Sequence, residues 1–563
     1  MVTVNYPPQL QAELLPKGAL PEFRLTLPEM QFPEEVNITE HYLDPNLQGE
    51  QANRIAFYSG DRQITYLELS RLVNRLGNGL RGLGIGKGDR VILRIPNCVE
   101  FVVCALALHR LGAVVIPTMV LLRERTVTYI ANTTEAKALI ASHDLLEEIE
   151  LGRDKYQTVQ HLIAVGGGPA QLKDRGYLSY EELIESSSDR LESVKVKRDD
   201  LAVVFFTSGT TGMPKGCMHL HLTVMSGPKS SPYLFGGMRP DDVLGGTPPL
   251  AFVFGYAHMM LLPLITGVPS ALIEGRATPE AIFQSIQKHR VTVLNSAPAA
   301  YVQMLNVVDA EKKYDLSSLR LTLCGSAPML AAMFHQWKAR FGTELMNCMG
   351  STESFTAYLG SWSPGDKPAS LGSPLLSWEA RIIDEQGNDC PRGTLGRLAI
   401  RGTGGIMYWR NPEKQVEAVI DGWSLTGDLA YQDEDGCFWH SSRSDDIIKS
   451  RGYRVSPGEV EDALMEHPAV FEPAVIGAPD PIQGERVKAF VQLKQGHQGS
   501  HELAEEMRQF VRARLAAYQV PSEIEFIDAV PKTETGKIRR KDLKEMEEER
   551  YANRQLSGGG NRE

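Results

Sequence analysis

The sequence predicts an α/β protein in which layered, mostly parallel sheets flanked by helices form a large N-terminal domain, followed by a small α+β domain. Three observations support this fold class. The 563 residues exceed what one ordinary hydrophobic core accommodates. Short apolar strand-like runs alternate with helical stretches over most of the chain. Near residue 445 the pattern changes to a compact set of strands and helices large enough to form its own core.

The large domain is expected to span residues 51–444, after an arm at 1–50. The arm is rich in proline and acidic residues, and we expect it to lie over the surface. Within the domain, strands are expected at 90–95, 113–116, 138–141, 162–165, 271–273, 291–294, 319–324 and 344–349, and helices at 99–111, 279–289 and 329–341.

The small domain is expected to span residues 445–545. The capping box Ser456-Pro-Gly-Glu459 predicts a helix that runs to about residue 467. Strands at 474–476, 487–493 and 523–527 and a charged helix at 502–515 follow. The tail 546–563 is strongly charged and ends in a glycine-rich run, which predicts disorder.

Composition narrows the classes of partner and location. The formal net charge of −11 disfavours nucleic acid or an anionic membrane as the main partner. The seven cysteines are scattered and form no Cys-x-x-Cys pair, so disulfide or zinc frameworks are not expected and a reducing compartment fits. The N-terminus lacks the pattern of a signal peptide, and the apolar stretches 101–117 and 261–273 are interrupted by basic residues or proline, which favours core elements over membrane spans. We therefore predict a cytoplasmic protein.

The most informative segment is the loop that follows the apolar run 201–206. It reads Thr207-Ser208-Gly209-Thr210-Thr211-Gly212-Met213-Pro214-Lys215-Gly216. The glycines let the backbone approach an anion, the hydroxyls add donors, and Lys215 adds a positive charge. This pattern indicates phosphate binding but is not a Walker motif, since Gly216 follows the lysine. Taken alone, the stretch would also fit a polar surface loop.

Five further segments follow this loop in a fixed order. They are Cys324-Gly-Ser-Ala-Pro328, Gly350-Ser-Thr-Glu353, Leu425-Thr-Gly-Asp428, Arg443-Ser-Asp-Asp446 leading to Lys449-Ser-Arg-Gly-Tyr-Arg454, and Pro531-Lys-Thr-Glu-Thr-Gly-Lys537. Together the six segments resemble those of the acyl-adenylate-forming superfamily, which includes acyl-CoA synthetases, firefly luciferase and peptide-synthetase adenylation domains. The resemblance spans roughly residues 50–545. It implies a β-barrel-like subdomain in the large domain and a mobile small domain.

The resemblance implies an ATP-dependent carboxylate–CoA ligase, an acid–thiol ligase that forms acyl-AMP and pyrophosphate and then acyl-CoA and AMP. Lys537 resembles the mobile catalytic lysine and Lys215 the lysine of the phosphate loop. Glu353 resembles the ligand of the cofactor Mg²⁺, Asp428 the acceptor of both ribose hydroxyls, and Arg443 a second ribose contact. The other residues expected to bind ATP or AMP are Thr207, Ser208, Gly209, Thr210, Thr211, Gly212, Gly325, Ser326, Ala327, Met349, Gly350, Ser351 and Thr352. Of these, the loop that begins at Gly325 and ends at Pro328 would lie along the adenine face. Many family members have an aromatic residue where this chain has Met349, whose thioether can still cover the adenine.

The resemblance also places a hinge at Asp445. After adenylation the small domain would rotate, withdraw Lys537 and present a CoA-binding face. That face would comprise Lys449, Arg451, Gly452, Tyr453 and Arg454, with Gly452 lining a passage for pantetheine where a side chain would block the way. From the residues alone, Asp445 also fits an ordinary linker acid, and the basic residues also fit a solvated loop.

The segment 247–258 is the most informative for the acid substrate. It resembles the corresponding segment of benzoate- and 2-aminobenzoate-CoA ligases, as do residues 407–411 and 455–457. By position, the acyl pocket is expected to contain Phe252, Val253, Phe254, Gly255, Tyr256, His258, Ala299 and Phe355. Such a pocket suits an aryl ring or a short branched chain, although aromatic residues near a sheet edge are also common in cores. Thr356 replaces a pocket histidine of benzoate ligases, so a medium-chain fatty acid remains an alternative.

Two other classes remain open. One is an adenylating enzyme that loads a carrier protein instead of coenzyme A. The other is an ATP-binding protein without ligase activity, against which the retention of Glu353, Asp428, Arg443 and Lys537 argues. The pair His219-x-His221 has no third ligand nearby, so packing is expected rather than metal binding. The run 402–405 lacks Rossmann spacing and fits a turn. The oligomeric state stays open, and a homodimer is compatible with the sequence.

Overall fold

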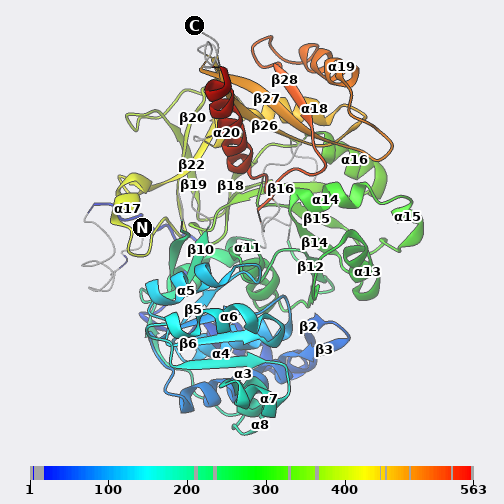
Figure 1. Cartoon of the computed structure of the whole chain (residues 1–563). Helices are drawn as coiled ribbons and strands as arrows, with labels where there is room; N and C mark the ends of the chain where they lie inside the picture. The colour runs from blue at the N-terminus through cyan, green and yellow to red at the C-terminus, as the bar shows by residue number, and fades with distance from the viewer. Residues whose placement is uncertain are drawn as a thin grey trace.

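The computed structural model describes Val4 and residues 18–207, 213–231, 237–327, 331–361, 367–443, 446–450, 453–480, 484–533 and 537–558. Within these ranges, a large N-terminal part contains three main sheets and a small C-terminal part contains a fourth (Figure 1). Residues 55–65, in blue, supply two strands of the second sheet, and the chain then passes through the cyan first sheet, the green remainder of the second sheet and the yellow third sheet to the orange and red small part.

The first sheet has seven strands in the order β11-β10-β5-β4-β6-β7-β8. Their bounds are β4 Arg90–Arg94, β5 Val114–Pro117, β6 Ala138–Ser142, β7 His161–Val165, β8 Leu178–Ser179, β10 Leu201–Thr207 and β11 Lys215–Leu220. All neighbours pair in parallel except β10 and β11, which form an antiparallel hairpin. Helix α4 (Val99–Arg110) is apolar on all sides and buries every residue but Glu100. The apolar stretch that begins at 101 is therefore a core element, as predicted.

The second sheet has nine strands in the order β18-β17-β16-β15-β14-β12-β13-β2-β3. Their bounds are β2 Ile55–Ser59, β3 Arg62–Thr65, β12 Leu244–Gly246, β13 Ser270–Leu272, β14 Val293–Ser296, β15 Leu321–Cys324, β16 Leu345–Gly350, β17 Ala357–Gly360 and β18 Ser373–Pro374. The strands from β2 to β16 pair in parallel, and antiparallel strands close both edges. The helices α13 (Pro279–His289), α14 (Pro298–Leu305) and α16 (Ala331–Phe341) lie between its strands in sequence.

The third sheet is antiparallel throughout and forms a half-barrel. It contains β19 Glu379–Ile383, β20 Gly396–Arg401, β21 Val419–Ile420, β22 Trp423–Gln432 and β23 Phe438–Arg443. Together with the parallel sheets and the C-terminal domain, this arrangement confirms the predicted α/β fold class.

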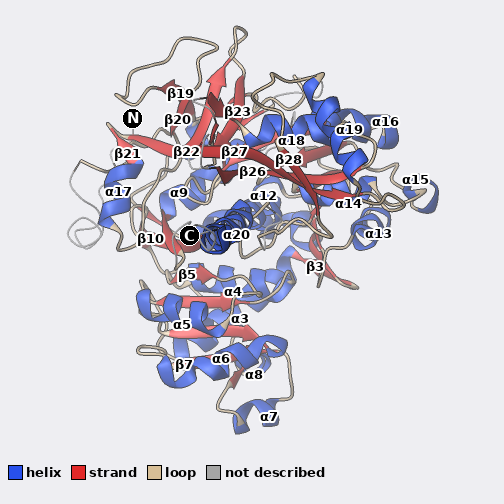
Figure 2. Ribbon diagram, turned by 45° about the horizontal axis from the view of Figure 1, so that its top comes forward, coloured by secondary structure: helices blue, strands red, loops and turns tan. Residues whose placement is uncertain are grey.

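The small C-terminal part is built on five strands. They are β24 Ile448–Ser450, β25 Tyr453–Val455, β26 Val470–Asp480, β27 Gly484–Leu493 and β28 Glu523–Phe526. The helices α18 (Pro457–Met465), α19 (His501–Arg512) and α20 (Arg540–Gly558) accompany them (Figure 2). Two clusters of buried apolar side chains are drawn almost entirely from these elements, so the small part has its own core.

Further helices and strands complete the large part. They are β1 Glu35–Val36, β9 Val196–Lys197, α2 Ile38–Tyr42, α3 Tyr66–Gly82, α5 Glu124–Thr133, α6 Leu146–Gly152, α7 Pro169–Asp174, α8 Tyr180–Glu185, α9 His221–Ser226, α11 Val253–Gly255, α12 Leu262–Thr266, α15 Ala310–Lys313 and α17 Pro412–Ala418. Among the residues described above, none of the helices combines the length and apolarity that crossing a bilayer requires.

Three local predictions were wrong. The described part of the arm from residue 18 to residue 50 does not simply lie over the surface, because Phe23, Met30 and Ile38 are buried in the large core. The tail is helical up to Gly558, and Glu547 is buried there among cations. The helix predicted from the capping box does form, but the Ser456 hydroxyl donates to Ser441 O at 2.6 Å instead of capping it.

Candidate active site

The carboxyl ends of four parallel strands meet at one edge of the nine-stranded sheet. Strands β12, β14, β15 and β16 pair in parallel registers, so the segments that leave them lie at the same edge. These segments begin the predicted acyl pocket (247–258), the helix that holds Ala299, the predicted adenine loop (325–327) and the loop that carries Glu353. The edge where parallel strands end is the usual ligand edge of such sheets.

The predicted phosphate loop joins β10 to β11. Thr207 is paired with Lys215 where the hairpin opens, and the predicted residues Ser208, Gly209, Thr210, Thr211 and Gly212 lie outside the described residues. Strand periodicity places Lys215, Cys217 and His219 on one face of β11. A hollow of about 190 Å³ lies beside Lys215, with Phe206 and Trp409 among its walls.

The loop that carries Glu353 is tightly fixed. A side chain at Gly350 would place its Cβ 2.7 Å from Thr356 O, so only glycine fits there. Ser351 N donates to Ser354 Oγ at 3.0 Å, and Ser354 Oγ donates to Thr356 O at 2.7 Å. Phe355 is fully buried at φ +69°, an uncommon conformation for an aromatic residue, and its ring centroid lies 5.1 Å from that of His219.

Glu353 is half-buried and accepts a hydrogen bond from Tyr408 Oη at 3.2 Å. Burial and the charge of Glu353 raise the pKa of Tyr408 far above its ordinary value, so its hydroxyl stays a donor. In the described part of the chain, no group of three or more His, Cys, Asp or Glu side chains is arranged to hold a metal. A single carboxylate fits Mg²⁺, which commonly takes one or two protein carboxylates and completes its shell with phosphates and water.

Asp428 is nearly buried on β22, directly opposite Arg443 on β23. His440 Nε2 lies 3.4 Å from Asp428 Oδ1, and Arg443 Nη1 lies 3.7 Å from the same oxygen. Burial alone would raise the pKa of Asp428, but the hydrogen bond from His440 and the charge of Arg443 lower it below its ordinary value. The carboxylate is thus held ionised and oriented.

Lys537 comes from the small domain to the same place. Its charge interacts with Asp428, Glu353 and Arg443, which belong to the large domain. Crowding by protein atoms lowers the pKa of Lys537, and the two carboxylates oppose part of that shift, although the residue itself remains solvent-exposed. The loop is anchored by Lys532, whose Nζ lies 2.8 Å from Glu472 Oε2. Residues far apart in the sequence therefore converge on one charged site between the domains.

The predicted adenine loop lies against the predicted acyl segment. A Cβ at Gly325 would lie 3.0 Å from Cys348 Sγ and 3.3 Å from the Phe254 ring. Ser326 has φ +76°, an uncommon conformation for a non-glycine residue. Ala327, Met349 and the residues Ser351 and Thr352 are half-buried at the same edge of the sheet.

The predicted acyl pocket divides into half-buried and buried residues. Phe252, Phe254 and Ala299 are half-buried, whereas Val253, Gly255, Tyr256, His258 and Phe355 are buried. The Tyr256 hydroxyl lies 2.6 Å from His109 Nε2 in the core, and the His258 ring packs edge-on against Phe254 at 5.0 Å. Burial lowers the pKa of His258 to about 4, so the ring is neutral. Residues Tyr256–Leu261 form a π-helical turn, a feature frequent at functional sites.

Of the predicted CoA-binding residues, Lys449 lies on β24, and Tyr453 and Arg454 lie on β25. Lys449 and Tyr453 are exposed, and Tyr453 stacks on Tyr518 at 4.3 Å. The predicted hinge Asp445, together with Arg451 and Gly452, lies outside the described residues, as does the side chain of Arg454. The assignments of site residues and of domain boundaries therefore stay predictions.

His219 and His221 are both fully buried, and burial lowers their pKa values to about 3 and about 4. Neutral buried imidazoles fit the packing role that the sequence indicated.

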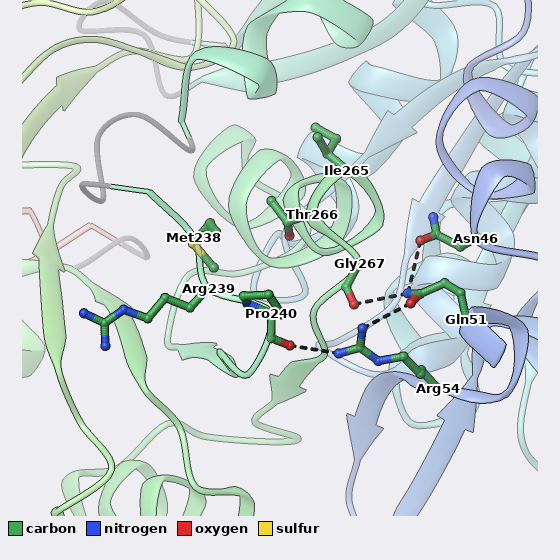
Figure 3. Close-up of a pocket in the computed structure, with 9 residues that line it drawn as sticks. All are labelled: Asn46, Gln51, Arg54, Met238, Arg239, Pro240, Ile265, Thr266 and Gly267. Atoms are coloured by element: carbon green, nitrogen blue, oxygen red, sulfur yellow. Dashed lines mark hydrogen bonds between the residues drawn. The ribbon is translucent and has the colours of Figure 1, made fainter.

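A second hollow, of about 320 Å³, lies apart from this site (Figure 3). Gln51 donates to Asn46 Oδ1 and to Gly267 O, and Arg54 donates to Gln51 Oε1 and to Pro240 O. These polar groups form hydrogen bonds with one another across the hollow. Such bonds are expected where segments of the chain pack together and not in a substrate pocket.

Among the residues that sequence reasoning missed, two contact the predicted carboxylates Glu353 and Asp428. They are Tyr408, which binds Glu353, and His440, which lies beside Asp428. Tyr408 belongs to the segment 407–411, whose likeness to aryl-CoA ligases was the only available signal. Nothing in the residues around His440 indicates its neighbour across the sheet.

Comparison with known proteins agrees with this geometry. Residues 46–408 match the family model described as AMP-binding enzyme, and residues 459–537 match that of the AMP-binding enzyme C-terminal domain. The chain is 34% identical to Acetyl-coenzyme A synthetase of Bacillus subtilis (strain 168), over 91% of both proteins. It is 32% identical to Benzoate–CoA ligase of Thauera aromatica, over 92% of this chain and 98% of that protein. A crystal structure of the anthranilate CoA ligase AuaEII in complex with anthranoyl-AMP matches with a TM-score of 0.88 at 33% identity, over 93% of this chain and 100% of that one.

Proposed function

The chain belongs to the AMP-binding enzyme family, among its acyl-CoA synthetases and ligases, and on that premise we propose that it activates an aromatic acid of the benzoate or aminobenzoate type. The observation that carries the proposal is the convergence of Asp428, Glu353 and Arg443 with Lys537 of the small domain. This group combines a carboxylate for ribose hydroxyls with cations for phosphate oxygens.

In the first half-reaction, an oxygen of the acid attacks the α-phosphorus of ATP. The bond to pyrophosphate breaks as the acyl-AMP bond forms. Lys537 would face the negative charge that grows on the α-phosphate, and Asp428 would fix the ribose. Glu353 would hold Mg²⁺, which neutralises phosphate charge when it is bound.

In the second half-reaction, the thiol of coenzyme A attacks the acyl carbonyl and AMP leaves. We propose that Lys449, Arg451, Gly452, Tyr453 and Arg454 form the face that receives coenzyme A after a rotation at Asp445. A cytoplasmic location fits all three substrates.

The aromatic preference is supported by the residues near the adenine loop. Phe252 and Phe254 are half-buried, and the Phe254 ring would lie 3.3 Å from a Cβ at Gly325, so an aromatic acid bound beside Gly325 would meet a flat apolar wall. The likeness to benzoate and anthranilate ligases agrees with this preference. The likeness to an acetyl-CoA synthetase is the reason to test acids of other shapes.

The experiment is acid-dependent exchange of pyrophosphate into ATP. The panel contains benzoate, 2-aminobenzoate, 4-hydroxybenzoate, octanoate and acetate, and AMP release is then measured with coenzyme A or with a phosphopantetheinyl carrier protein. Exchange with the aryl acids and release with coenzyme A are expected. Preference for octanoate would favour the medium-chain alternative, release with the carrier alone would favour the loading enzyme, and no exchange with any acid would overturn the proposal.

A further inference from the structure

Tyr408 joins the strand that follows the phosphate loop to the carboxylate of Glu353. Its segment pairs with β11 through a single antiparallel bridge, in which Met218 N donates to Met407 O and Trp409 N donates to Gly216 O, both at 2.8 Å. Cys217 lies directly opposite Tyr408 in this pairing. The position of Tyr408 is thus set by the strand that begins with Lys215.

The backbone of Tyr408 is also fixed from the other side. Its N–H donates to Gln415 Oε1 at 2.8 Å. Gln415 is fully buried, and its Nε2 donates to Ala19 O and to Ile406 O, each at 2.8 Å. Every polar atom of this buried amide side chain has a partner, so the segment has little freedom to shift.

The hydroxyl of Tyr408 reaches a different sheet. It donates to Glu353 Oε1 at 3.2 Å, and Glu353 follows β16 of the nine-stranded sheet, whereas β11 belongs to the seven-stranded sheet. A hydrogen bond to an ionised carboxylate is stronger than one between neutral groups and fixes the orientation of the acceptor. One carboxylate oxygen is held in this way, and within the described residues no hydrogen bond engages the other, which leaves it for a ligand.

We propose that Tyr408 is a positioning residue that orients Glu353 toward the divalent cation accompanying ATP and ties it to the strand of Lys215. This inference rests on the proposed function, because it takes Glu353 as the cation ligand. Partners that orient metal ligands commonly affect metal affinity by about 10–100-fold.

The test compares Tyr408→Phe with wild type and with Tyr66→Phe. Tyr66 is fully buried and donates its hydroxyl to Pro263 O at 3.1 Å, so it is a matched loss of one buried tyrosine hydroxyl away from the site. ATP affinity is measured by calorimetry with Mg²⁺ and with EDTA, and Mn²⁺ affinity in the presence of ATP is measured by electron paramagnetic resonance. In Tyr408→Phe, Mn²⁺ affinity is expected to fall about tenfold, with ATP binding in EDTA unchanged. Tyr66→Phe is expected to lower the melting temperature and leave both affinities unchanged.

Unchanged Mn²⁺ affinity in Tyr408→Phe would overturn the inference. An equal loss of ATP binding with Mg²⁺ and with EDTA would also overturn it, because Tyr408 would then support the fold of the phosphate loop and not Glu353. Wild-type protein that binds Mg²⁺ and ATP but exchanges no pyrophosphate with any acid would instead refute the proposed function, and the two failures are therefore distinguishable.

Discussion

Replacing Lys537 with alanine separates the two half-reactions that the proposed function requires. Lys537 is the contribution of the small domain to a group that otherwise contains Asp428, Glu353 and Arg443. Removing it leaves one cation, Arg443, opposite two carboxylates. The acid and the triphosphate would then bring further negative charge to a site that has one cation fewer to offset it.

The size of the effect follows from the role of one charged donor. Loss of one donor aimed at charge that develops in a transition state slows a reaction by about 10²–10³-fold, or about 2.7–4 kcal/mol of activation free energy. Lys537 is solvent-exposed, so the alanine variant is expected to keep its fold. Acyl-AMP formation should therefore fall by about that factor.

The assay measures the half-reactions separately. Pyrophosphate exchange reports adenylation, and acyl-CoA formation from supplied acyl-AMP reports thioester formation. Lys541→Ala is the matched control, because Lys541 is an exposed lysine of the small domain that pairs with Glu545 outside the site, and its exchange rate should stay near that of wild type. Equal losses of both half-reactions in Lys537→Ala would refute the reasoning.

Three further predictions concern charge and space at the site. Because the pKa of Lys537 is lowered, the lysine loses its positive charge at a lower pH than an ordinary lysine, whose pKa is about 10.4. Adenylation should therefore fall on the alkaline side, and the same fall in Lys537→Arg would contradict this. Asp428→Asn should weaken ATP binding about tenfold, since Arg443 then faces a neutral amide; unchanged affinity in calorimetry would be inconsistent with a ribose contact. Gly350→Ala should lower stability by about 1–3 kcal/mol and weaken binding of ATP with Mg²⁺, because its Cβ would meet a backbone oxygen at 2.7 Å. Gly82→Ala, where nothing lies within 4 Å, is the control with no expected loss.

The fold was predictable where local pattern and tertiary context agree. The helix predicted at 279–289 is α13, and each predicted strand of the large domain lies within two residues of an observed one. These elements have apolar runs with clear boundaries, and their burial follows directly from composition.

The errors arose where distant contacts outweigh local composition. The charged tail was predicted to be disordered, yet Glu547 of α20 lies 2.9 Å from Lys488 Nζ, and both side chains are 1% exposed. Arg550 of the same helix reaches Glu525 on β28 at 2.8 Å. A run of charges is normally solvated, and only the fold reveals partners elsewhere in the chain that neutralise it.

The candidate site shows the same division between residue type and arrangement. The motifs could be read from the sequence because the chemistry of phosphate and ribose dictates which side chains serve, and each motif is only a few residues long. That the motifs lie close together in space could not be predicted from the sequence, because it depends on which strands are neighbours in the sheet. Strands β12, β14, β15 and β16 end side by side although they are far apart in the chain.

Tyr408 is the clearest case of such an arrangement. It is 55 residues from Glu353 in the sequence and reaches it by joining an edge strand of a different sheet. A tyrosine beside a tryptophan would ordinarily be interpreted as packing, and in the sequence its ring is indistinguishable from a core aromatic. The structure separates the two roles, because the ring packs while the hydroxyl donates to a carboxylate. Removing that oxygen alone, as Tyr408→Phe does, therefore tests the polar role without disturbing the apolar one.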